Sequence, residues 1–223
     1  MRHGGASARD VRIPSGAAVL MGNVVVPIGS KGIVLFAHGS GSSRHSPRNL
    51  FVADALQRAG LATLLFDLLT AEEENVDRYT REHRFDVALL GRRLADATRW
   101  VRGEADLAPL RIGYFGASTG SAAALVAAAE PAADIGAIVS RGGRPDLAGG
   151  KLLAQVTAPT LLIVGGDDHV VMGLNREACA AMRCAKEIAI VPGASHLFEE
   201  PGTLEAVADL AADWFTRHLQ QDT

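Results

Sequence analysis

The stretch LRIGYFGASTGSAAALVAAA, residues 110–129, places a glycine-flanked serine between a short apolar run and a helix of small residues. An apolar run of this length without polar alternation is typical of a strand buried on both faces. Ser118 follows the run, and Gly116 and Gly120 are small enough for a strand and a helix to pass closely. The alternative is an ordinary strand end followed by an N-capping serine. We expect a sharp strand-to-helix turn that holds the Ser118 hydroxyl above a parallel sheet.

Apolar runs of the same kind recur along the chain and alternate with segments of helical periodicity. The alternation predicts parallel strand pairing, right-handed crossovers and helices on both faces of the sheet. We therefore expect an α/β fold, a doubly wound and mostly parallel sheet of about six parallel strands. The other expected strands are residues 33–37, 62–66, 135–140, 160–164 and 187–191, and the clearest helices are 50–59, 85–102, 118–129, 175–183 and 204–219.

Residues 1–30 are expected to add an N-terminal hairpin at one edge of the sheet, turning at Gly22-Asn23. The segment 67–84 lacks convincing periodicity and is interpreted as a surface loop near the site's rim. Ser140 and Thr160 are 20 positions apart, which leaves room for a loop and one short helix but not for a lid domain. With no internal repeat and no linker, residues 1–223 are expected to form a single domain.

Charge and composition exclude several classes of partner. The 22 basic and 25 acidic residues give a net charge of −3, which provides no electrostatic footprint for nucleic acid or an anionic membrane. No apolar run approaches the roughly 20 residues that a membrane helix needs. Cys179 and Cys184 lack the spacing of a redox pair and suit a reducing compartment. We expect a cytoplasmic protein, and the sequence leaves its oligomeric state open.

Ser118 has candidate catalytic partners after two later strands. A serine hydroxyl needs a base to become nucleophilic, and the base needs a carboxylate to orient it. Asp167 and Asp168 follow the fifth run, and His196 follows the last one. Because the carboxyl ends of parallel strands share one edge of the sheet, these groups are expected to converge. His38 lies after the first buried run, and a buried imidazole that braces its loop is the favoured interpretation there.

The segments GASTG (116–120), GGDD (165–168) and GASH (193–196) resemble, in this order, the α/β-hydrolase superfamily. The small lidless branch related to dienelactone hydrolases is most similar, from about Lys31 through the last helix. In that superfamily the acid usually lies three residues after the glycine that ends its strand, which implies Asp168 rather than Asp167. Typical dienelactone hydrolases carry a cysteine nucleophile, so Ser118 implies serine esterase chemistry and leaves the substrate open.

Residues 37–49 resemble the oxyanion loop of the same family. The resemblance implies that the backbone N–H groups of Ser40 and Thr119 stabilise the negative charge that develops on a substrate carbonyl oxygen. Such preorganised donors contribute about 3–4 kcal/mol each to transition-state binding. Because only the backbone donates, the side chains at these positions are expected to matter less.

Several arginines occur near loops at the same sheet edge. A guanidinium at the rim of a site binds a carboxylate in bidentate fashion. We expect Arg44, Arg81 or Arg144 to contact a negatively charged group of the substrate, the alternative being that each is solvated or paired with surface acids. The arginines near this edge are Arg44, Arg48, Arg78, Arg81, Arg141 and Arg144.

Together these features favour a serine hydrolase that cleaves small esters or lactones through an acyl-enzyme, with no metal or organic cofactor. Two other functions are weighed against it. A dinucleotide-binding protein would use Gly39, Gly41 and Asp67, but its third glycine would fall at Arg44, which is too bulky for close helix–strand packing. A non-catalytic, hydrolase-like binding protein would not need intact candidates for all three catalytic groups.

Overall fold

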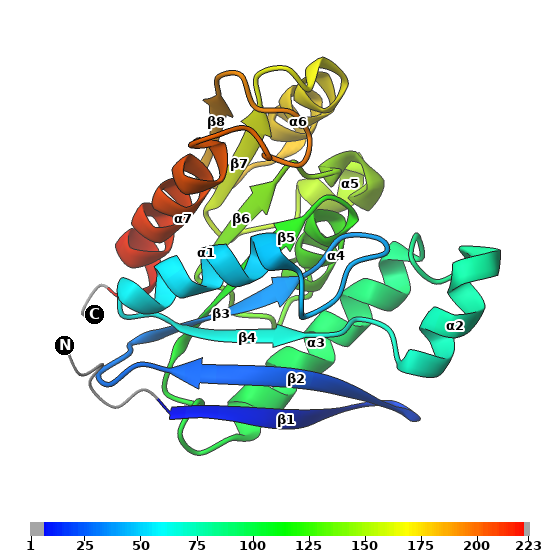
Figure 1. The fold of residues 1–223 in the computed structure, drawn as a ribbon, viewed down its shortest axis with the longest axis vertical. Helices are drawn as coiled ribbons and strands as arrows, with labels where there is room; N and C mark the ends of the chain where they lie inside the picture. Colours follow the sequence, from blue (N-terminus) through cyan, green and yellow to red (C-terminus); the bar gives the residue numbers. More distant parts are fainter. Residues whose placement is uncertain (1–6, 221–223) are drawn as a thin grey trace.

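In the computed structural model, which describes residues 7–220, eight strands form one sheet in the order β1-β2-β4-β3-β5-β6-β7-β8 (Figure 1). β3 to β8 are parallel, and the antiparallel pair β1 and β2 lies at one edge. The predicted fold class, six parallel strands with an edge hairpin, is confirmed. The strands are β1 Ser7–Ser15, β2 Ala18–Val26, β3 Gly32–Ala37, β4 Ala62–Phe66, β5 Arg111–Ala117, β6 Ala137–Arg141, β7 Thr160–Gly165 and β8 Lys186–Val191.

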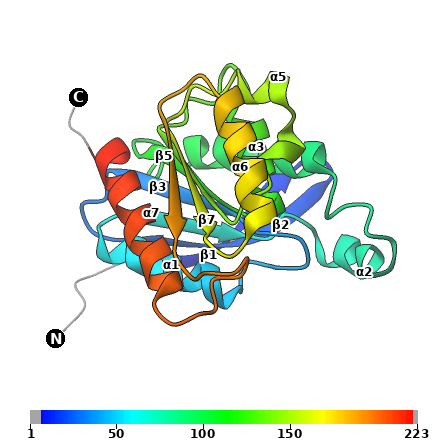
Figure 2. The same cartoon turned by 90° about the horizontal axis from the view of Figure 1, so that it is seen from above.

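Helices cover both faces of the sheet, and each face has its own apolar core (Figure 2). One core packs α1 and α7 against the sheet, and the other packs α3, α4 and α6 against the opposite face. No helix in the described part of the chain is long and apolar enough to cross a membrane. The helices are α1 Pro47–Arg58, α2 Ala71–Thr80, α3 Val87–Gly103, α4 Thr119–Ala128, the 3₁₀ helix η1 Pro145–Ala148, α5 Gly150–Leu153, α6 His169–Ala181 and α7 Thr203–Leu219.

The turn of the edge hairpin was predicted at the wrong place. β2 runs straight through Gly22 and Asn23, and the chain turns instead at Gly16-Ala17, where Ser15 pairs with Ala18. Gly16 has a φ of +58°, which a glycine adopts without strain. Gly22 is needed for packing, since a Cβ there would lie 3.0 Å from the Cβ of Phe66. Part of the expected hairpin segment, residues 1–6, lies outside the described residues.

The segment predicted as a loop contains α2, which Figure 1 shows standing away from the sheet. Thr70 and Glu73 form a reciprocal capping box at its start, and Arg81 ends it with a φ of +60°. Asp77 is its one buried residue. The prediction was therefore wrong because the helix buries a carboxylate instead of an apolar stripe, so no hydrophobic periodicity marks it.

Candidate active site

Ser118 occupies a strained turn between β5 and α4. Its φ of +50° and ψ of −121° are unusual for a residue with a side chain. The Ser118 N–H donates to the carbonyl of Arg141 at 3.2 Å, and the Ser118 carbonyl accepts from the N–H groups of Ser121 and Arg144, each at 3.1 Å. These backbone bonds hold the turn from both sides and so fix the backbone position from which the Ser118 hydroxyl extends.

Two glycines let the strand and the helix approach each other at this turn. A Cβ on Gly116 would lie 2.4 Å from the Cα of Ser121, and a Cβ on Gly120 would lie 2.1 Å from the carbonyl oxygen of Ala37. Neither distance is compatible with a side chain. Residues without a side chain are therefore required on both sides of Ser118, as predicted, because the backbone packs directly against them.

His196 is paired with Asp168. Its Nδ1 lies 2.7 Å from Oδ2 of Asp168, and because an ionised carboxylate only accepts, Nδ1 carries the proton. The Asp168 side chain is 14% exposed and also caps α6 through the N–H of Val171. Asp167 is exposed and contributes its backbone N–H to the carbonyl of Ala194. The structure thus brings the second aspartate of the pair, and not the first, to the imidazole.

Ser118 and His196 lie on either side of one turn that follows β6. Arg141 binds the Ser118 N–H, and a Cβ on the next residue, Gly142, would lie 3.7 Å from Cε1 of His196. Within the described residues, neither the Ser118 hydroxyl nor Nε2 of His196 has a hydrogen-bond partner. Both groups are thus free to act on a third molecule or on each other.

The predicted oxyanion donors lie on neighbouring segments. Of the segment 37–49 predicted as the oxyanion loop, Ala37 ends β3 and residues 47–49 begin α1. We call the residues between them, 38–46, the oxyanion loop from here on. Ser40 donates its N–H to the Thr119 hydroxyl at 2.9 Å, and the two hydroxyls are 2.8 Å apart. The Thr119 N–H is the first of α4 and has no acceptor within the helix, where the helix dipole also favours negative charge. A Cβ on Gly39 would lie 3.2 Å from the Ser118 Cβ, so the loop directly adjoins the serine.

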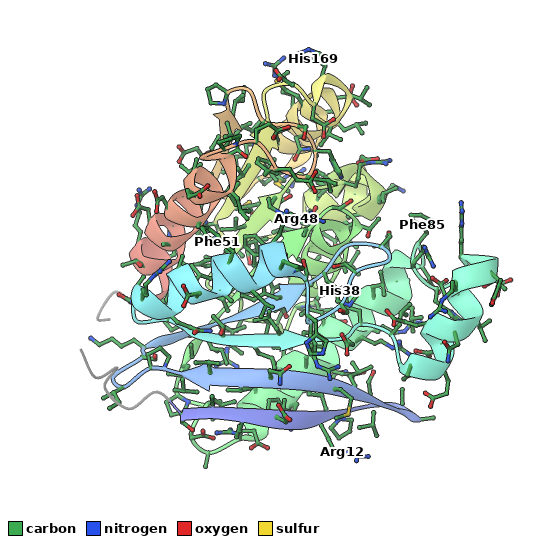
Figure 3. All side chains as sticks on the ribbon, in the orientation of Figure 1. Arg12, His38, Arg48, Phe51, Phe85 and His169 are labelled. Carbon is green, nitrogen blue, oxygen red and sulfur yellow. The ribbon has the colours of Figure 1, made fainter. Side chains whose placement is uncertain are left out.

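His38, labelled in Figure 3, braces the oxyanion loop. Its Nδ1 lies 3.0 Å from the carbonyl of Gly39, and its Nε2 accepts the N–H of Leu68 at 2.9 Å. These bonds are compatible only with a neutral ring protonated at Nδ1. Burial lowers the pKa of His38, which favours the same neutral form. The interpretation of His38 as a buried brace agrees with these contacts.

Two of the three expected substrate arginines have acidic partners. Arg44 forms an ion pair with Asp67 and also donates its backbone N–H to that carboxylate. Arg144 makes two hydrogen bonds to Asp146, at 2.9 and 2.8 Å. Arg81 is exposed, and no described residue binds its side chain. Of the three candidates, Arg81 is thus the one whose guanidinium has no acidic partner among the described residues.

A cavity of about 280 Å³ opens beside Ser40. One wall is apolar and another carries charged groups of α2 and of the segment after it. The charged wall includes Arg84, which no motif in the sequence singles out. The lining residues are His38, Gly39, Ser40, Gly41 and Ser42 of the oxyanion loop, Leu68 and Leu69 after β4, Glu74, Asp77 and Arg78 of α2, and Arg84 and Leu90.

Arg84 is held in place by the buried carboxylate of Asp77. Its Nε donates to Asp77 Oδ2 at 2.5 Å and its Nη2 to the Asp77 carbonyl at 2.9 Å. Burial opposes ionisation of Asp77, but Arg84 and the N–H groups of Arg84 and His83 outweigh it and lower the Asp77 pKa. Nη1 of Arg84 stays free and lies 3.6 Å from where a Cβ of Gly41 would be. No hydrophobic pattern marks the Asp77–Arg84 pair, so the sequence alone does not predict it.

Glu74 belongs to the charged wall of the cavity, and burial and the neighbouring Asp67 raise its pKa.

No group of three or more metal-ligating side chains occurs among residues 7–220. Cys179 and Cys184 are free thiols, both partly buried. The strained serine, the histidine–aspartate pair and the backbone donors all lie at this edge of the sheet.

No protein-family model matches the chain. A curated protein of Mycobacterium tuberculosis, named as a putative phosphoribosyl transferase, is 57% identical over 210 residues, which are 94% of this chain and 46% of that protein. The chain thus spans about half the length of such curated relatives. An uncharacterized protein of the same organism is 30% identical over 85% of this chain and 73% of its own.

Solved structures show the same fold. A crystal structure of dienelactone hydrolase from Anabaena variabilis superposes with a TM-score of 0.94 at 56% identity, covering 96% of this chain and 99% of that one. A dienelactone hydrolase-like promiscuous phosphotriesterase from metagenomic libraries has a TM-score of 0.74 at 20% identity, over 97% of this chain and all of that one. An esterase from an Arctic intertidal metagenomic library has a TM-score of 0.76 at 18% identity, over 98% and 97% of the two chains.

Proposed function

The chain belongs to the dienelactone hydrolase-like α/β hydrolases, and on this premise we propose that it is a serine hydrolase of small esters or lactones. The proposal rests on one observation above the others, the 2.7 Å hydrogen bond between His196 and Asp168 at the sheet edge that carries Ser118. A serine in a strained turn, followed along the chain by a mostly buried aspartate and then a histidine, suits acyl transfer.

The proposed mechanism assigns one role to each group. His196 takes the Ser118 proton at Nε2, while Asp168 keeps Nδ1 protonated and supports the imidazolium charge. Ser118 attacks the carbonyl carbon, and the N–H groups of Ser40 and Thr119 bind the oxyanion. His196 then protonates the leaving alcohol, and a water molecule that it activates releases the acid. The mechanism calls for no metal or organic cofactor.

The Thr119 hydroxyl has a preparatory role in this proposal. It accepts the Ser40 N–H at 2.9 Å and so holds that donor in place before substrate arrives. A carbonyl oxygen entering the site takes over this N–H, and the Thr119 hydroxyl keeps its bond to the Ser40 hydroxyl. Preorganised donors of this kind stabilise developing charge without a cost of reorientation at the moment of reaction.

The cavity beside Ser40 supports a small substrate. Its volume of about 280 Å³ lies just below the usual range for ligand sites, which begins near 300 Å³. Leu68, Leu69 and Leu90 suit a short hydrocarbon part, and the free Nη1 of Arg84 suits a polar or negatively charged substituent. Of the arginines proposed from the sequence, Arg81 stays a candidate for charge recognition, whereas Arg44 and Arg144 would first have to leave Asp67 and Asp146.

The dinucleotide-binding alternative is less well supported. It would require Asp67 to bind ribose hydroxyls, but that carboxylate is paired with the guanidinium and the backbone N–H of Arg44. A phosphoribosyl transferase function is not proposed, because that name belongs to relatives of which the chain covers 46%. Free thiols at Cys179 and Cys184 suit a reducing compartment, and a cytoplasmic location is part of the proposal.

A panel of chromogenic acetyl, butyryl and octanoyl esters, with lactones and anionic esters, tests the proposal on purified protein. We expect hydrolysis of short esters or lactones by the wild type and loss of that activity in Ser118→Ala. Arg58→Met, a change of an exposed arginine on α1, serves as the matched control and should keep the activity. If no ester or lactone is cleaved, or if Ser118→Ala cleaves them as well as the wild type, the proposal fails.

A further inference from the structure

Arg141 is a buried arginine without an acidic partner. Its residue is 7% exposed, and its Nε and Nη1 are buried with no hydrogen-bond partner among the described residues. Its guanidinium carbon lies 5.9 Å from the centre of the Phe198 ring, an aromatic contact that offers only part of what a carboxylate would. A charge removed from water without a counter-charge is costly, so a fold keeps one only where something compensates it.

A second arginine increases the positive charge at this point. Arg48, labelled in Figure 3 at the start of α1, also has a buried Nε with no partner in the described part of the chain. Its Nη1 donates to the exposed carboxylate of Glu199 at 2.9 Å. Burial and the neighbouring Arg48 lower the pKa of Arg141 to about 10, and no carboxylate acts against them. The charge that acts on Arg141 is therefore of its own sign.

The two arginines lie next to the proposed catalytic groups. Arg141 is the last residue of β6, and its carbonyl holds the Ser118 N–H. We call residues 192–202, between β8 and α7, the histidine loop. Phe198 and Glu199, which contact the two guanidinium groups, belong to this loop, as does His196. The arginines thus connect the base of the histidine loop to the turn that carries the serine.

The charges define the ligand that would compensate them. Two guanidinium groups less the one carboxylate of Glu199 leave a single positive charge, which calls for a monoanion. Nη2 of Arg141 has no partner among the described residues and, unlike Nε and Nη1, is not fully buried, so it is the nitrogen through which a ligand would bind. A carboxylate has the planar two-oxygen geometry that a guanidinium edge matches, and it is the anion class that ester hydrolysis releases.

We propose that Arg141 and Arg48 bind a small carboxylate beneath the histidine loop, next to Ser118. The carboxylate is either a second group of the substrate or the free acid, and these two sources rest on the proposed function. The binding site itself does not, since it follows from two guanidinium groups of which only Arg48 has an acidic partner.

Thermal unfolding in sodium acetate and in sodium chloride of equal ionic strength tests the site. Acetate should raise the wild-type Tm above the chloride value and saturate at millimolar concentration. Arg141→Met and Arg48→Met should each lose this difference, and Arg58→Met on the outer side of α1 should keep it. Arg48→Met decides the matter if Arg141→Met does not fold. Equal shifts in both salts, or an acetate effect that survives both substitutions, would overturn the proposal.

Kinetics separate the two sources of the carboxylate. If the group belongs to the substrate, the ratio of kcat/KM for monoethyl succinate over diethyl succinate falls about tenfold or more in Arg141→Met. If it is the free acid, that ratio stays constant and the inhibition constant of acetate rises about tenfold instead. If neither the ratio nor the inhibition constant changes in Arg141→Met, the proposal is contradicted. Failure of the proposed function is a distinct result, in which no ester is cleaved while the acetate shift in Tm is still present.

Discussion

Oδ2 of Asp168 lies 2.7 Å from Nδ1 of His196, although 28 positions of the chain separate the two residues. The contact exists because β7 and β8 are parallel neighbours, so the residues that follow them emerge at the same edge of the sheet. Ser118 emerges at that edge as well, after β5. Three residues on separate loops thus emerge at one edge of the sheet, which is the arrangement that a nucleophile and its base require.

The first prediction concerns the nucleophile and the base. Ser118→Ala and His196→Ala should each lower kcat by about 10³-fold or more, because either change removes the acyl-transfer step. The double variant should lose barely more than either single one, since the two groups act as a unit. Steady-state kinetics on one short chromogenic ester, with circular dichroism as the check on folding, measures both effects. Additive losses in the double variant would contradict the assigned roles.

The second prediction separates the adjacent acids. Asp168→Asn should lower kcat by about 10⁴-fold, because an amide at this position favours the wrong tautomer of His196. Asp167→Asn should have a mild effect, since that side chain is exposed and does not contact the imidazole. The same kinetic assay compares the two variants. A larger loss in Asp167→Asn would move the proposed acid by one residue and leave the reaction class intact.

A third prediction concerns the length of the acyl chain. The segment between β6 and β7 forms only η1 and α5, and the cavity beside Ser40 holds about 280 Å³. We therefore expect kcat/KM to fall from acetyl and butyryl to octanoyl esters, without activation at a lipid–water interface. Rates measured below and above the solubility limit of each ester decide this. A preference for the octanoyl ester would sink the assignment of the cavity to the substrate.

His38 makes stability depend on pH. Burial lowers its pKa, so the unfolded chain takes up a proton near pH 6.5 and the native imidazole only at lower pH. The free energy of unfolding contributed by neutral His38 is thus present above about pH 6.5 and is lost as the pH falls toward the native pKa. Tm measured from pH 8 to 5 should fall more steeply for the wild type than for His38→Gln. Parallel curves would show that this imidazole does not control the acid sensitivity.

Local patterns in the sequence predict the sheet and the turn at Ser118. The features that were predicted wrongly or not at all depend on contacts between distant segments. The apolar run before Ser118 predicts β5 because burial on both faces leaves a purely local signature. Gly22 looked like a turn, but its role is to admit Phe66 from β4, a residue far along the chain. The helix that buries Asp77 has no apolar stripe to mark it.

The arginines show the same limit at the candidate site. The sequence predicts that several arginines lie in loops near one edge of the sheet. Which of these arginines are paired depends on the carboxylates that the fold brings beside them. Arg144 finds its partner two residues away, while Arg141 is buried against Phe198 of the histidine loop, and the charge of Arg48 lowers its pKa. Burial of a charge without a partner is a property of the folded chain, so the sequence pattern alone could not single out Arg141.

The most direct test of the central claim is active-site labelling with a fluorophosphonate, read by intact-protein and peptide mass spectrometry. An activated serine attacks the phosphorus, its oxygen forms the new P–O bond, and fluoride leaves. We predict one label per chain on the peptide that contains Ser118, slower labelling in His196→Ala, and none in Ser118→Ala. A wild-type protein that stays unlabelled, or a label of equal extent in Ser118→Ala, would contradict it.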